Sequence, residues 1–491
     1  MGPSIKKTLI KDTALYSLAN YFAMALGIVV SIIAKALLGA AGAGQWALIK
    51  VFCSYGEYSD LGTRNAMLRE MAQSSGSGDK EKSLLVRDSS FSFMSLMACV
   101  SATIIFFSAF FKVQDPVLRK GLFVASLLVI ATQGYNFYLC LLRTLKKITA
   151  LSSLVVLNMV FVTLFSLLGC WMARVIGFAL GTFFATAISA FLGYKFSGSA
   201  VLWKWDSKEI IRLLKIGVPT VLISYALVTF LSLDSVMIGK MIGLKELGYY
   251  TIGLMAVQQV STIGRFTQII LMPYIQEHYG KSKQIKESRH YFLRITRVLV
   301  FVLPVIIAGV IFLLPCVVHY LLPKFLPGIF SMKILVLGYF FVVVNEMSST
   351  ILFTMNKQGR LIPILLGLVL MAFALNYGFI RKGWGIEGVA IATGMTYFFY
   401  FIFLFVFAFR EILTGFELFK TIILVIFIFL YFSSMIFFLD QHIHIRAVLM
   451  EGIIKCGVFI FLFLPFLVYL EKKEGLLGII ADLLHKKGAL A

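Results

Sequence analysis

Four charged residues share one face of a strongly apolar stretch near the N-terminus. At about 100° per residue, Lys50, Glu57 and Arg64 fall on one helical stripe, and Asp60 lies close to it. A Lys, Arg or Asp at mid-membrane costs roughly 2.5–3.5 kcal/mol on insertion scales, so this face cannot point to lipid. It must face other helices or water, either as a buried ion-pair network that fixes packing or as a site for a charged ligand.

Other apolar stretches carry polar residues in the same way. They include Asn20, Lys35, Asp234, Gln258, Arg265, Gln268 and Glu346, with Glu451 and Lys455 near the end of a later stretch. A shared polar cavity explains all of them together, whereas separate hydrogen-bonded patches must be assumed one at a time. Its deep cations would be Lys35, Lys50, Arg64 and Arg265, and its deep acids Glu57, Asp60, Asp234 and Glu346.

A cation-lined cavity suits an anionic substrate, because Arg and Lys donate charge-assisted hydrogen bonds to phosphate. We therefore predict substrate binding by the four cations together with Asn20, Gln258 and Gln268, and candidate ion coupling by the four acids. The alternative is that four cations and four acids neutralise one another without a ligand.

The elements that position these residues are membrane helices. The 491 residues are 60% hydrophobic and only 14% charged, far from the roughly 25% charged residues of soluble domains. We predict an all-α polytopic membrane protein with about fourteen transmembrane helices. Their approximate limits are 14–38, 44–65, 89–111, 119–142, 149–171, 175–195, 215–240, 247–272, 297–321, 328–355, 361–380, 386–409, 420–439 and 447–470.

Alternate connections hold most of the 45 Lys and Arg residues. The positive-inside rule then places both termini in the cytoplasm, and we predict a multi-pass protein of the cell inner membrane. The connections on the opposite side are a few residues each, so no external domain is expected. The net charge of +22 is therefore interpreted as topological and not as a sign of nucleic-acid binding.

An internal repeat divides the chain. Gly39 and Gly44 recur 204 residues later as Gly243 and Gly248, each pair at a predicted outer hairpin. The repeat predicts two pseudo-symmetric six-helix lobes, with the substrate site between them. The predicted parts are an N-lobe (1–195), a cytoplasmic linker (196–214), a C-lobe (215–410), and a C-terminal helix pair with its tail (411–491).

Metal and thiol chemistry are not expected. The six cysteines lie in or at the ends of apolar runs, without a Cys-x-x-Cys motif or a paired-histidine ligand set, and small buried hydrophobes are their expected role. We predict no cofactor, no metal and no nucleic-acid partner, and we expect a monomer whose partners are membrane lipids and its substrate.

One stretch carries a resemblance to a known family. Its elements are Asp60-Leu-Gly62, Asn65-Ala66 and Arg69-Glu70, followed by Gly76-x-Gly78-Asp79. Here the chain resembles the Wzx-type polysaccharide (O-antigen) flippases of the multidrug/oligosaccharidyl-lipid/polysaccharide (MOP) exporter superfamily. The specific motif covers about 40 residues, whereas the similarity in layout extends over most of residues 1–410.

The resemblance implies a substrate and a role. The substrate would be an oligosaccharide on undecaprenyl pyrophosphate, turned from the cytoplasmic to the outer leaflet by alternating access, as in O-antigen and lipopolysaccharide synthesis. By family analogy, Arg64 and the cavity cations would hold the pyrophosphate. Fourteen spans are more like the lipid II flippases, but the first helix has Lys35 as its one deep cation where those proteins are arginine-rich.

Three other functions share features with this sequence. A lipid II-type flippase and a multidrug antiporter share the superfamily, and the excess of deep cations argues against a cavity for cationic drugs. A membrane enzyme such as a ligase or polymerase would need a large external loop, which the short outer connections exclude. We therefore predict a transporter and not an enzyme, coupled to protons, to sodium or to the membrane potential.

Overall fold

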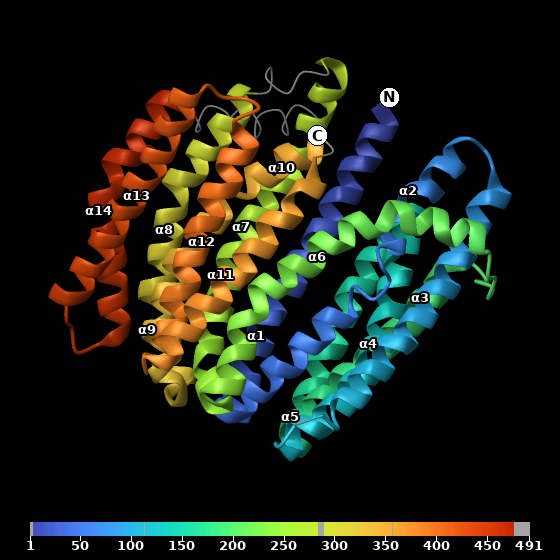
Figure 1. The fold of residues 1–491 in the computed structure, drawn as a ribbon, viewed down its shortest axis with the longest axis horizontal. Coiled ribbons are helices and arrows are strands. Elements are labelled where there is room, and N and C mark those ends of the chain that lie inside the picture. Colours follow the sequence, from blue (N-terminus) through green and yellow to red (C-terminus); the bar gives the residue numbers. More distant parts are fainter. Residues whose placement is uncertain (1–2, 112, 283–288, 356, 476–491) are drawn as a thin grey trace. The chain divides into compact units, whose positions relative to one another are not determined.

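The computed structural model describes residues 3–111, 113–282, 289–355 and 357–475, and all regular structure in these residues is helical (Figure 1). The prediction of an all-α polytopic membrane protein is confirmed. The chain divides into two compact units, one ending at Gly248 and the other beginning at Tyr249. Each unit is a bundle of long helices.

The first unit contains six complete helices and the start of α7. They are α1 (Pro3–Gly56), α2 (Thr63–Gly76), α3 (Lys80–Ser108), α4 (Pro116–Thr144), α5 (Ile148–Ser197), α6 (Ser207–Met241) and α7 (Leu244–Ser282). Aspartates cap three of the helices. Asp79, Asp115 and Asp206 each accept a hydrogen bond from the backbone N–H three residues on, which satisfies one of the donors left open at the start of α3, α4 and α6.

The number of spans agrees with the sequence once the helix breaks are considered. Eleven helices in the described residues are long and apolar enough to cross a membrane. Helix α5 contains two predicted spans, α1 contains one and the first part of the span 44–65, and the predicted span 247–272 lies in α7, which is not among the eleven. The breaks lie at Gly39, with φ +69° in α1, and at Ala173 and Arg174 in α5.

One detail of the prediction is wrong. Lys50, Glu57 and Arg64 do not lie on one continuous helix, because α1 ends at Gly56 and α2 begins only at Thr63. Leu61 and Gly62 take the left-handed conformation, with φ +47° and +79°, which a helix cannot contain. Gly56, Ser59, Asp60 and Gly62 are residue types that turns favour, a local signal of the break that the regular spacing of the charges masked.

The second unit is built from the rest of α7 and the later helices. They are α8 (Arg289–Leu321), η2 (Pro323–Gly328), α9 (Ile329–Val344), α10 (Glu346–Thr354), η3 (Gln358–Arg360), α11 (Leu361–Arg381), α12 (Gly385–Phe409), α13 (Gly415–His442) and α14 (Val448–Glu474). Helices α9 and α12 pack closely where Gly338 meets Gly394, as small residues allow in membranes. Stacked and edge-on aromatic rings, such as Phe301 on Phe466, join α8 to α14.

The segment predicted as a cytoplasmic linker is held against α3. Arg87 donates to the carbonyl of Ala200 at 2.9 Å, and the hydroxyl of Ser92 accepts from the backbone N–H of Lys204 at 2.9 Å. Helix α6, which follows the linker, packs on α1 and α2. The linker and α6 therefore belong to the first compact unit, which ends at Gly248. The boundaries of the two repeat lobes remain a prediction.

The two glycine hairpins of the repeat contact each other. A Cβ at Gly44 would overlap the carbonyl of Leu244, and a Cβ at Gly248 would overlap the carbonyl of Ala40. Ala40 and Leu244 are themselves related by the 204-residue repeat, so the contact is reciprocal, as at a two-fold interface. Gly44 and Gly248 are thus glycines because two backbones meet there, whereas Gly39 and Gly243 have φ of +69° and +148°, which favour glycine.

Gly44→Ala is expected to destabilise the protein, because its methyl group requires the two hairpins to move apart. Overpacking of this kind costs roughly 1–3 kcal/mol, and the measurement is the thermal unfolding midpoint in detergent. Gly309→Ala is the control, since a Cβ there meets no atom within 4 Å. Equal midpoints for the two variants would show that the hairpin contact is not tight.

Candidate functional site

The centre of the candidate site is the turn at 57–62, where α1 ends and α2 has not begun. A helix end frees backbone carbonyls, which are costly to leave unbonded inside a membrane. Gln133 of α4, only 2% exposed, supplies the donor: its side-chain nitrogen lies 3.0 Å from the carbonyl of Gly56, 3.2 Å from that of Glu57 and 2.9 Å from the Ser59 hydroxyl. One amide therefore stabilises the break.

Asp60 shapes the other side of the turn. It is 1% exposed, and one carboxylate oxygen accepts from the backbone N–H of Gly62 at 3.0 Å. The other oxygen lies 3.4 Å from Nε of Arg64, an ion pair outside hydrogen-bonding geometry. Arg64 is 22% exposed, so its guanidinium is positioned by a buried acid yet remains accessible.

Helix α6 closes on this turn through aromatic and glycine contacts. The Tyr55 hydroxyl donates to Thr229 at 3.0 Å, and the rings of Tyr55 and Tyr225 stack with centroids 6.3 Å apart. Gly62 and Gly217 meet backbone to backbone, so that a side chain at either position would clash with the other. The turn is therefore fixed against α4 on one side and α6 on the other.

The predicted charged residues of α1 form a series of electrostatic neighbours that leads from Lys35 to the turn. Lys50 and Glu57 are exposed, and Lys35 donates to the Ser31 hydroxyl at 2.8 Å. Lys50 lies within electrostatic range of both Lys35 and Glu57, and Glu57 within range of Arg64. The structure thus brings together five of the predicted residues, three cations and two acids.

The other predicted residues lie elsewhere. Asn20 is exposed on α1 and donates to the carbonyl of Tyr16 at 2.7 Å. Asp234 is buried in α6 and accepts from the backbone N–H of Ser235 at 2.7 Å. Gln258 of α7 and Glu346, the first residue of α10, belong to the second unit. The side chains of Arg265 and Gln268 lie outside the described residues.

Two features of the site were missed at the level of sequence. Gln133 was overlooked, although it is one of two amides in the apolar run 119–142, with Asn136, and polar residues of this kind need a partner inside a membrane. The tyrosine contacts between Tyr55, Tyr58 and Tyr225 left no signal, because aromatic residues are frequent throughout this chain.

Most of the quoted family motif has a structural role here. Glu70 is buried and pairs with Arg212 of α6, and the φ of Gly78 is +79° in the turn before α3, which Asp79 caps. Gly62 fits the close contact with α6. Most residues of the motif therefore fix the position of α2 against α6 and the start of α3.

Comparison with known proteins identifies the family. The model of the polysaccharide biosynthesis protein family matches residues 9–279, more than half of the chain. This chain belongs to that family. No curated protein matches it by sequence.

Solved structures show the fold of this family member. The lipid II flippase MurJ in an inward closed conformation matches with a TM-score of 0.69 at 15% identity, over 93% of this chain and 100% of that one. An inward-facing multidrug resistance MATE transporter of the MOP superfamily gives 0.57 at 16%, over 87% and 95%. A MOP superfamily transporter from Pyrococcus furiosus gives 0.53 at 14%, over 87% and 95%. This member of the polysaccharide biosynthesis protein family therefore has the same fold as these membrane transporters.

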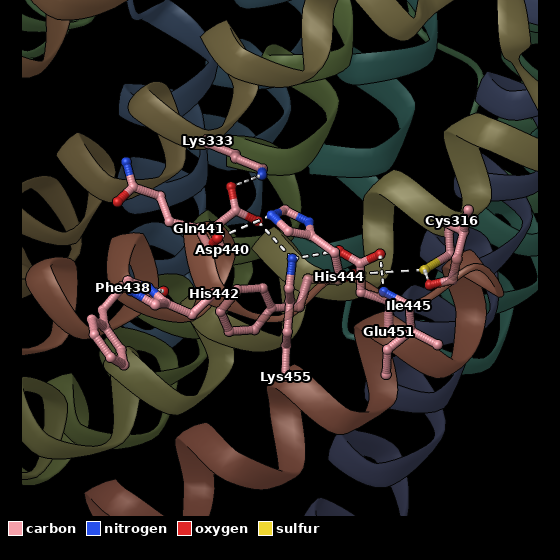
Figure 2. Close-up of polar contacts among 12 residues, drawn as sticks. Cys316, Lys333, Phe438, Asp440, Gln441, His442, His444, Ile445, Glu451 and Lys455 are labelled. Atoms are coloured by element: carbon pink, nitrogen blue, oxygen red, sulfur yellow. Dashed lines mark hydrogen bonds and ion pairs between the residues drawn. The ribbon is translucent and has the colours of Figure 1, made fainter.

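Glu451 and Lys455, two further polar residues of the sequence, belong to a closed ionic cluster in the second unit (Figure 2). Lys455 is 4% exposed and donates to Asp440 at 3.1 Å and to Glu451 at 2.5 Å, while Lys333 of α9 pairs with the same Asp440. The Cys316 thiol of α8 donates to the carbonyl of Val448 at 3.2 Å. The cluster fastens the α13–α14 hairpin to α8 and α9 and requires no ligand.

Lys455→Met is expected to lower stability by about 1–3 kcal/mol, because it leaves two partly buried carboxylates with fewer donors. The measurement is thermal unfolding of the purified protein. Lys473→Met on the same helix is the control, since Lys473 is exposed and contacts the Tyr469 hydroxyl. An unchanged midpoint for Lys455→Met would mean that the hairpin does not depend on this cluster.

Proposed function

We propose that this polysaccharide biosynthesis family member is a flippase for a lipid-linked oligosaccharide. It moves an oligosaccharide on undecaprenyl pyrophosphate from the cytoplasmic to the outer leaflet of the inner membrane, in the manner of a Wzx-type O-antigen flippase. The similarity of its fold to that of MurJ, a lipid II flippase, supports a lipid-linked substrate. Both termini are proposed to lie in the cytoplasm.

The series of charges Lys35, Lys50, Glu57 and Arg64 carries this proposal, because each lies within electrostatic range of the next and the series ends at the α1–α2 turn. Three cations face two carboxylates there, one of which, Asp60, is buried beneath Arg64. The remaining positive charge suits a pyrophosphate, which accepts several charge-assisted hydrogen bonds. Asn20 of α1 and the α7 residues Gln258, Arg265 and Gln268 are proposed as further substrate-binding residues.

Alternating access requires an opening that closes on one side of the membrane at a time. The reciprocal contact of Gly44 and Gly248 places two backbones against each other at the hairpins that the sequence predicts to be outer. We propose that this contact closes the outer side while the pyrophosphate-sugar head enters from the cytoplasm. The polyprenyl tail stays in lipid.

Arg64→Gln tests the substrate contact. Lipid extracts of the purified wild-type protein are expected to contain a polyprenyl pyrophosphate, and the variant is expected to retain about tenfold less, since a hydrogen bond to a charged group contributes roughly 1.5–3 kcal/mol. Mass spectrometry of the extract is the measurement, and Arg69→Gln, an exposed arginine of the same helix, is the control.

A double variant separates this role from the pairing with Asp60. Asp60→Asn with Arg64→Gln removes both charges, so the buried carboxylate is no longer left alone and stability should return toward that of the wild type. Lipid retention should stay low if Arg64 binds the substrate. Restored retention would assign Arg64 a purely structural role, and a co-purified drug or lipid II would instead identify the alternative substrates.

The membrane potential is the proposed driving force. Moving about two negative charges outward through an inside-negative membrane releases roughly 2 × 2.3 kcal/mol per 100 mV. In vesicles with balanced pH and sodium, flipping of the lipid-linked sugar should accelerate when an inside-negative potential is imposed. A rate that responds only to a proton or sodium gradient would assign the coupling to the acids Glu57, Asp60, Asp234 or Glu346.

A further inference from the structure

The second unit contains an apolar groove between α11 and α12 that the proposed transport does not use. Its volume is about 760 Å³, and nine of its ten lining residues are apolar, glycine or proline. Arg410 is the tenth. The groove follows α11 from Pro363 to Met371 and α12 from Ile402 to Arg410.

A missing side chain opens the groove. A Cβ at Gly367 would meet no atom within 4 Å, so space that a side chain would otherwise fill is empty along the middle of this wall. On the opposite wall Phe403 and Val406 are 51% and 37% exposed. The groove is therefore open along its length on the outer surface of the α11–α12 pair, where lipid would contact it.

The length of the groove corresponds to one leaflet. The eight steps from Pro363 to Met371 rise about 12 Å at 1.5 Å per residue, which approaches half of a hydrocarbon core about 30 Å thick. An acyl chain spans one leaflet, whereas a polyprenyl tail of the length used for lipid-linked sugars would extend far beyond it. The groove dimensions fit a phospholipid chain.

The charge lies at one end only. The Arg410 guanidinium is exposed and lies 4.4 Å from the centroid of the Phe407 ring, so the cation is held at the mouth of the groove. Its neighbour Glu411 accepts from Lys357 at 2.8 Å, and this bond holds the pKa of Glu411 below its usual range. Arg360 lies within electrostatic range of the same carboxylate.

The balance of charge at the mouth favours an anion. Lys357, Arg360 and Arg410 are three cations and Glu411 is one carboxylate, which leaves a net charge of +2. Among the residues that the structure describes, no ion pair occupies Arg410. We propose that the groove binds one anionic phospholipid, with an acyl chain between α11 and α12 and the phosphate on Arg410.

The opposite end of the same helix pair offers a matched control. Arg381, the last residue of α11, also lies over an aromatic ring, 5.2 Å from the centroid of Tyr377, but it does not line the groove. Gly378 resembles Gly367 in that a Cβ there meets no atom within 4 Å. Charge and bulk can therefore be changed toward either end of the α11–α12 pair, with similar effects on folding.

Native mass spectrometry of the full-length protein in detergent tests the proposal, with phosphatidylglycerol and phosphatidylcholine of identical chains as probes. Wild type should retain phosphatidylglycerol preferentially, and Arg410→Gln should retain it about fivefold less, the effect of one cation near an anionic headgroup. Gly367→Leu should lose both lipids. Arg381→Gln and Gly378→Leu should behave as wild type.

Each opposite result would overturn the proposal. Equal retention of the two lipids by wild type, or unchanged phosphatidylglycerol binding by Arg410→Gln, would show that the site does not recognise an anionic headgroup. Unchanged lipid binding by Gly367→Leu would show that the groove is not the binding site. If Gly367→Leu fails to fold, Arg410→Gln still tests the proposal. Displacement of phosphatidylglycerol by equimolar polyprenyl phosphate would assign the groove to the tail of the substrate.

Discussion

The structure depends on how the backbone is satisfied where α1 stops and α2 starts. Inside a membrane no water replaces a lost helical hydrogen bond, so a break of six residues survives only if side chains supply the partners. Gln133 donates to the carbonyls at the end of α1, and Asp60 accepts from the N–H of Gly62 at the start of α2. Because α4 provides one partner and α6 covers the turn, the break is stable only in the assembled first unit.

The fold was largely predictable, and the exceptions have physical causes. Hydropathy and length gave the helical class and the spans, because a membrane helix must be apolar over its whole length. The glycine repeat correctly marked the hairpins, since glycine at Gly44 and Gly248 is required by a backbone contact. The break after Gly56 was missed because its polar partners come from α4, about 76 residues away in sequence.

The sequence predicts which residues belong to the site better than it predicts how they are arranged. Charge cost alone shows that Lys50, Asp60 and Arg64 must avoid lipid, and the structure brings them together near one turn. The sequence could not separate residues that hold the turn from residues available to a ligand. Exposure makes that distinction: Asp60 and Glu70 are buried against backbone or Arg212, whereas Lys50 is open. The family motif in this region therefore contains residues that pack the helices as well as residues that could contact a ligand.

The pairing of Arg64 with Asp60 is compatible with anion binding for a geometric reason. Asp60 contacts Nε at 3.4 Å, on one edge of the guanidinium. An arginine carries five N–H donors, four of them on the two Nη atoms, so a single contact at Nε leaves the planar fork available to a phosphate. The buried acid also reduces the side-chain freedom that Arg64 would lose on binding. The contact with Asp60 thus orients Arg64 and leaves its Nη donors open, so that it serves both the fold and the proposed site.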